Sequence, residues 1–131
     1  MMEILFRGKR IDGKGWAYGD LFQNEGRAWI LIINDQFLNS PQMIEVIPET
    51  VGQFTGIPDK NGVKIFRGDI MLLGDGTKRK TVIEYDSLRA QFVARLFDKN
   101  SIRMAVSFWS AGEIIGNIHE NPNYWRENES L

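Results

Sequence analysis

The sequence predicts an all-β fold with little helix, in which an N-terminal β-meander precedes a small barrel or roll. Short stretches rich in valine, isoleucine and aromatic residues alternate with turns marked by glycine, asparagine and aspartate. No stretch carries an apolar stripe of helical period over three turns. The 131 residues, 43% of them hydrophobic and 25% charged, suit one globular domain with a core of ordinary size.

The first 33 residues contain three expected strands joined by two turns. Asp12-Gly-Lys-Gly15 supplies the glycines that tight turns favour, and it separates a strand over residues 3–11 from one over 15–23. Asn24-Glu-Gly-Arg27 forms the second turn, and the following strand over 28–33 is apolar on both faces. Three consecutive strands with short turns predict a meander.

A polar stretch over residues 34–42 has the composition of a loop. It leads into a short strand over 43–47, which ends at Pro48 because proline cannot donate a hydrogen bond to a sheet. This is the most plausible break in the chain.

Six further short strands are expected after this break, over residues 51–56, 63–66, 70–73, 80–85, 90–98 and 113–118. Asn61-Gly62 is a strong hairpin signal between the first two. In the strand over 80–85, Val82 and Glu84 alternate with Ile83 and Tyr85, which predicts one buried face and one solvent-exposed face. Short strands at this spacing indicate a small barrel or roll.

Composition excludes several classes of protein. The absence of cysteine rules out disulfides, thiolate nucleophiles and cysteine-ligated metals, and it suits a reducing cytoplasm. The longest apolar run, over residues 28–33, is much shorter than the roughly 20 residues of a spanning helix, so no membrane association is expected. A net charge of −1 gives no bulk attraction to nucleic acid.

A long motif of strands and turns occupies residues 51–70, called the signature segment below. It contains Val51-Gly-Gln-Phe-Thr-Gly56, the turn Asp59-Lys-Asn-Gly62 and the strand entry Gly68-Asp-Ile70. Together with residues 3–7 and 114–122, the signature segment resembles the YopX family, phage and prophage proteins without an assigned activity. The similarity spans nearly the whole chain and is weakest from Gly19 to Glu49.

The resemblance implies a single YopX-like domain over residues 1–131, with an SH3-like β-barrel or roll in its central and C-terminal part. The expected subdivision is a meander over 1–48, the barrel over 49–122 and a tail over 123–131. It implies no activity that can be assigned to a residue. The signature segment itself is interpreted as architecture, since its glycines punctuate a hairpin and its apolar residues can fill a barrel interior.

No catalytic constellation, cofactor site or metal site is predicted, and an enzyme is the least supported class of function. His119 is the only histidine, and no local motif supplies it with a nucleophile or with paired metal ligands. Asp75 and Asp86 fall in predicted turns, where such side chains stabilise the bend. The loop before Lys80 lacks the GxxxxGK[ST] order of a phosphate-binding loop.

A nucleic-acid interface is the alternative prediction. Adjacent strands bring basic side chains together, with Tyr85 or Phe92 as surfaces on which bases could stack. The basic side chains are Lys78, Arg79, Lys80, Arg89 and Arg95. Against this interpretation, lysine and arginine commonly occupy the solvent-exposed faces and edges of a sheet.

The favoured prediction is a non-enzymatic protein-binding or self-assembling module that acts in the cytoplasm of a phage host. Trp16, Trp29, Trp109 and Trp125 are many indoles for this length, and a small barrel does not easily bury four. Some are therefore expected at a contact with another copy or with a phage or host protein. Phe108, Trp109 and Trp125 are the residues predicted for that interface.

Overall fold

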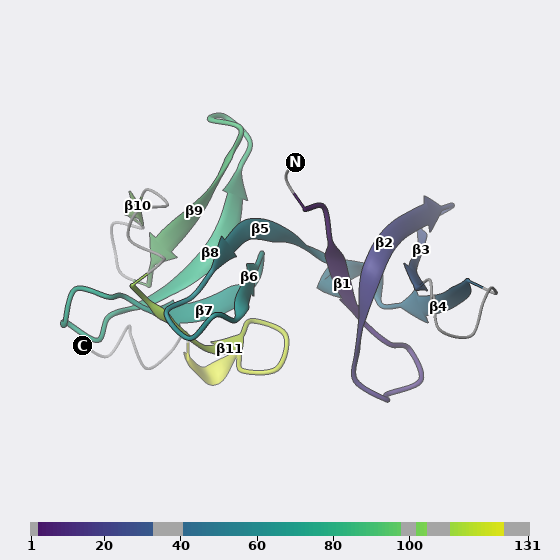
Figure 1. The fold of residues 1–131 in the computed structure, drawn as a ribbon, viewed down its shortest axis with the longest axis horizontal. Helices are drawn as coiled ribbons and strands as arrows, with labels where there is room; N and C mark the ends of the chain where they lie inside the picture. The colour runs from purple at the N-terminus through teal and green to yellow at the C-terminus, as the bar shows by residue number, and fades with distance from the viewer. Residues whose placement is uncertain (1–2, 33–40, 98–101, 105–110, 125–131) are drawn as a thin grey trace. The chain divides into compact units, whose positions relative to one another are not determined.

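The computed structural model describes residues 3–32, 41–97, 102–104 and 111–124, and the predicted all-β class is confirmed (Figure 1). The chain divides into two compact units, Met1–Phe54 and Thr55–Leu131, and each is described by itself. Among the described residues, none belongs to a helix with the length and apolar character needed to cross a bilayer.

The first unit is an antiparallel sheet in the order β4-β3-β2-β1, with the first residues of β5 beside β1. Its elements are β1 (Phe6–Lys9), β2 (Trp16–Asn24), β3 (Arg27–Ile32), β4 (Gln42–Val46) and the short 3-10 turn η1 (Pro48–Thr50). Glu25 and Gly26, both at positive φ, form the β2–β3 turn. The meander predicted from the turn residues is present.

This sheet curls, so that its first and last strands meet. Arg10, just beyond β1, forms a bridge with Val46, and the Ile47 N–H donates to the Lys9 carbonyl at 2.8 Å. A Cβ added at Gly8 would lie 2.7 Å from Val46 Cγ2, so glycine permits this approach. The inner face of the curl is the core, formed by Ala17, Ala28, Ile30 and Val46.

The second unit is built on a five-stranded antiparallel sheet in the order β10-β9-β8-β7-β11, with β5 paired to β6 (Figure 1). The elements are β5 (Gly52–Pro58), β6 (Lys64–Phe66), β7 (Asp69–Leu72), β8 (Lys80–Asp86), β9 (Gln91–Leu96), β10 (Arg103–Met104) and β11 (Glu113–Asn117). The chain turns between β5 and β6 at the predicted place, with Gly62 at a φ of 81°.

The sheet of the second unit carries a core on each face. On one face, Met71, Ile83 and Ala94 pack with Ile65 of β6. On the other, Ile70, Val82 and Phe97 pack together with Ile115 and Tyr124. The prediction of one buried and one solvent-exposed face for β8 is therefore wrong: Val82 and Ile83 point to opposite faces and both are buried.

Within the described residues this sheet is open, with β10 and β11 at its two edges, so a closed barrel over residues 49–122 is not confirmed. β11 pairs with β7 through a bulge at Ile115, between Ile114 and Gly116. No sequence pattern indicated β10, which is only two residues long.

Candidate functional site

The basic residues predicted for nucleic acid lie on the β8–β9 hairpin and the loop before it, but the three arginines pair with carboxylates. Arg79 contacts Asp75 at 3.0 Å, Arg95 contacts Glu84 at 2.9 Å, and Arg89 contacts Asp86 at 3.8 Å. Lys80 Nζ lies 5.2 Å from the centre of the Tyr124 ring. Lys78 lies in the loop at a φ of 58°. Much of the positive charge of this group is locally balanced, and the interface stays a prediction.

The residues predicted for a protein interface, Phe108, Trp109 and Trp125, lie outside the described residues. The other two indoles are described, and both lie on the outer face of the first sheet. Trp16 is on β2 and Trp29 on β3, and each alternates with core residues that point inward.

Large apolar side chains gather on this outer face, which we call the aromatic face. Strand alternation and register place its members on one side of β2, β3 and β4. Tyr18 is 47% exposed, Phe22 47% and Met43 53%. The Phe22 and Trp29 rings lie opposite each other across β2 and β3, with centroids 5.5 Å apart. The aromatic face consists of Trp16, Tyr18, Phe22, Trp29, Leu31 and Met43.

Two arginines lie over the indoles of the aromatic face. The Arg7 guanidinium is 4.8 Å from the Trp16 ring centre, and that of Arg27 is 4.9 Å from the Trp29 ring centre. Arg27 also donates two hydrogen bonds to Glu45, of 3.0 and 2.6 Å. These contacts restrict the motion of the Trp16 and Trp29 side chains. Alternation along the strand predicted over 15–23 is enough to place Trp16 on one side with Tyr18 and Phe22. Only the register of β2 with β3 shows that Trp29 shares this face.

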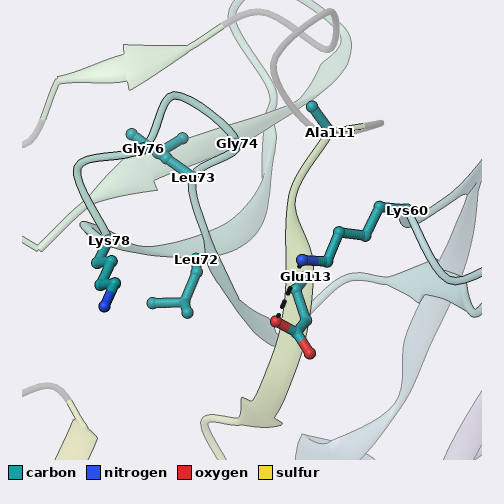
Figure 2. Close-up of a pocket in the computed structure, with 8 residues that line it drawn as sticks. All are labelled: Lys60, Leu72, Leu73, Gly74, Gly76, Lys78, Ala111 and Glu113. Atoms are coloured by element: carbon teal, nitrogen blue, oxygen red, sulfur yellow. Dashed lines mark ion pairs between the residues drawn. The ribbon is translucent and has the colours of Figure 1, made fainter.

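The second unit contains a cleft of about 320 Å³ beside the loop that follows β7 (Figure 2). The Lys60 and Glu113 side chains point toward one another there, with Nζ and a carboxylate oxygen 3.6 Å apart. The remaining lining residues are Leu72, Leu73, Gly74, Gly76, Lys78 and Ala111.

The described lining of this cleft contains two lysines and one glutamate but no serine, cysteine or histidine. The pair of Lys60 with Glu113 neutralises one of the two ammonium groups. Gly74 packs so closely on Ala111 that a Cβ would collide with the alanine backbone. The described lining of the cleft is therefore a mixed-charge surface, with one ion pair, Lys60 with Glu113, and one further lysine, Lys78.

Asp59 in the signature segment is a buried structural carboxylate. It is 5% exposed, its Oδ1 accepts the backbone N–H groups of Asn61 and Val63, and its Oδ2 accepts that of Ile114 on β11. Burial raises the pKa of Asp59, but these three hydrogen bonds outweigh it and hold the pKa below its ordinary value. The residue thus ties the β5–β6 hairpin to a strand 55 residues later.

The end of the signature segment contacts the C-terminal part of the chain in the same way. The Ile118 N–H donates to the Gly68 carbonyl, and Asp69 lies opposite Asn117 in the β7–β11 register. Asp69 is 2% exposed and accepts the Phe66 N–H at 2.8 Å, while Asn117 accepts the N–H groups of His119 and Glu120. These residues hold strands and turns together, as expected for a segment that serves architecture.

His119 lies beside this junction, where a Cβ on Gly68 would be 3.5 Å from its Nε2. Among the residues that the structure describes, no three histidine or acidic side chains gather in a way that could hold a metal ion.

Asp75 stabilises the loop between β7 and β8, and a titration can test how. Its pKa is lowered to about 2, first by the Thr77 hydroxyl, then by the Thr77 N–H and by Arg79. Because the folded pKa lies below the ordinary value of 3.8, this stabilisation is present above about pH 4 and is lost as the pH falls toward 2. We expect Thr77→Val to raise the Asp75 pKa, measured by NMR titration, and the remote Thr55→Val to leave it unchanged. An Asp75 pKa that stays near 2 in Thr77→Val would contradict this assignment.

Comparisons with known proteins agree with the fold. Three chains among solved structures match, and one is the crystal structure of protein EF1440 from Enterococcus faecalis. The two chains are 22% identical, the match covers 95% of this chain and 99% of that one, and the TM-score is 0.57. No curated protein matches. The family described as YopX protein matches residues 5–125, nearly the whole chain, and the chain therefore belongs to the YopX family.

Proposed function

We propose that this YopX family protein is a non-enzymatic protein-binding module and that the aromatic face is its contact surface. The observation that carries the proposal is the cluster of large apolar side chains on the outer side of a sheet whose inner side already holds the core. Exposed apolar clusters of this kind mark interaction sites in soluble proteins. Tyrosine, tryptophan, phenylalanine, methionine and arginine are also the residue types enriched in interfaces.

The charge of the first unit favours a protein over nucleic acid. Residues 1–54 contain five lysines and arginines against seven aspartates and glutamates, a balance of −2. On the outer side of the first sheet, Arg27 is engaged by Glu45, and the negative charge of Asp20 on β2 is matched by the positive charge of Lys9 on β1. A phosphate backbone would meet little net attraction on this unit.

An SH3-like roll for the second unit, together with action in the cytoplasm of a phage host, is the remaining part of the proposal. Antiparallel pairing along the chain from β7 to β10, with a hairpin packed on one face, supports such a roll. Small β-rolls commonly serve as recognition modules.

Affinity capture tests the proposed surface, with this chain as the bait and with cells that express the gene at its natural locus as the source of partners. The expected result is a protein retained by the wild-type chain and lost, by at least about tenfold, with Phe22→Ser and Tyr18→Ser combined. Leu88→Ser is the matched control, since Leu88 is 97% exposed in the second unit and lies far along the chain from this face. Retention that survives the double variant would contradict the proposal. Retention of nucleic acid that disappears on nuclease treatment would favour the alternative class.

A further inference from the structure

We propose that the partner on the aromatic face is a second copy of this chain, docked face to face about a two-fold axis that crosses β2 at Tyr18. This inference rests on the proposed function, because it names the partner of the same surface. Two charged groups of this face, Lys9 and Asp20, form no ion pair within the described part of the chain.

The charged groups on the outer side of the first sheet fall into two sets. Arg7 and Arg27 lie over indoles, and Glu45 is held by Arg27. Lys9 and Asp20 form no ion pair within the described residues, although both point to the same side as the aromatic residues. The unsatisfied charges of this face are therefore one cation and one anion.

Lys9 and Asp20 lie at equal distances from Tyr18 along β2. Lys9 on β1 is opposite Trp16, two residues before Tyr18, and Asp20 is two residues after it. At a rise of about 3.3 Å per residue, each level lies roughly 7 Å from Tyr18. A two-fold axis across the strand at Tyr18 exchanges the two levels.

This symmetry brings opposite charges together twice. Each Lys9 reaches the level of the partner's Asp20, one strand spacing of about 4.8 Å to the side, and facing sheets pack about 10 Å apart. The long lysine side chain spans such a gap. Tyr18 would meet its own symmetry copy at the centre, which is the self-complementary arrangement of an isologous dimer.

The face offers three exposed large apolar side chains in each copy, Tyr18, Phe22 and Met43. An interface of this extent falls at the low end of specific contacts, at or below about 1,200 Å² of total buried area. We therefore expect a dimer that dissociates on dilution and weakens as salt screens the two ion pairs.

Exchange of these charges in the 131-residue chain tests the geometry, with sedimentation equilibrium across a concentration series at low salt as the measurement. Lys9→Glu alone and Asp20→Lys alone each turn two attractive pairs into two repulsive ones, so each should raise the dimer dissociation constant by about tenfold or more. The double variant should restore it to within about threefold of the wild type.

An equimolar mixture of the two single variants should also associate. In that heterodimer the introduced glutamate of one chain faces the introduced lysine of the other, and the unchanged Asp20 of the first chain faces the unchanged Lys9 of the second. Both pairs are attractive again, so the mixture should associate more tightly than either single variant alone.

Thermal unfolding of each variant checks that the first unit remains folded. A wild-type chain that stays monomeric at millimolar concentration would overturn the inference, and so would a double variant or a mixture no tighter than the single variants. Those outcomes leave the proposed function intact if capture still depends on Tyr18 and Phe22. If the chain does not self-associate and capture does not depend on Tyr18 and Phe22 either, the aromatic face is not a contact surface.

Discussion

Replacing Asp59 by alanine is expected to lower the free energy of unfolding of the second unit by about 3 kcal/mol or more. The change removes one buried carboxylate and leaves the N–H groups of Asn61, Val63 and Ile114 without their acceptor. A buried donor without a partner costs about 1 to 3 kcal/mol, and water can satisfy part of this set. Denaturant unfolding followed by circular dichroism measures the loss.

Asp12→Ala is the matched control, because Asp12 also accepts a backbone N–H, that of Lys14, but lies exposed in a turn. Its effect should be a small fraction of the loss at Asp59, since water replaces the acceptor at an exposed turn. Equal losses for the two variants would show that burial of the Asp59 carboxylate is not what makes it important.

The contribution of Asp59 to the free energy of unfolding should also depend on pH. Since the pKa of folded Asp59 lies below its ordinary value, its stabilising contribution is complete above the unfolded pKa and disappears as the pH falls through the folded one. The stability difference between wild type and Asp59→Ala should therefore shrink on acidification below about pH 4. A difference that stays constant from about pH 7 to about pH 2 would contradict this assignment.

Gly19→Ala is expected to destabilise the first unit by about 2 to 3 kcal/mol. Gly19 lies on β2, and a Cβ added there would collide with the carbonyl oxygen of Leu31 on β3. Backbone cannot move aside as a flexible side chain can, so the two strands must separate locally. The measurement is the loss of hydrogen-exchange protection in β2 and β3, together with the unfolding free energy.

Gln23→Ala provides the control for this strand, because Gln23 is exposed on β2 and alanine needs no new space. Its effect should stay within about 0.5 kcal/mol. If Gly19→Ala proved as mild as Gln23→Ala, the close approach of β2 to β3 at Leu31 would be incorrect.

Turn residues account for what the sequence predicted well. Gly13, Gly26 and Gly62 adopt positive φ where hairpin turns were expected. The bounds of the strands between these turns are close to the predicted bounds. The chemistry that marks such turns is local, so it can be recognised without knowledge of the fold.

Contacts between distant residues account for what the sequence did not predict. Alternation along β8 suggested a single buried face, but Val82 is also buried, in a cluster that includes Ile115 and Tyr124 from much later in the chain. No periodicity in β8 carries that information. The aromatic face is partly local, since alternation along one strand places Trp16, Tyr18 and Phe22 on one side. Its extension to Trp29 depends on the register of β2 with β3.

The attachment of β11 to β7 bears on how the chain acquires its structure during synthesis. β7 ends at Leu72, whereas β11, its partner strand, begins only at Glu113. The sequence separation is larger still between Asp59 and Ile114, whose N–H donates to the Asp59 carboxylate. Contacts of such separation form slowly, since a long loop must close before they stabilise anything. Until Glu113–Asn117 has been synthesised, one edge of β7 lacks its partner strand in the nascent chain, and unpaired strand edges favour misassembly.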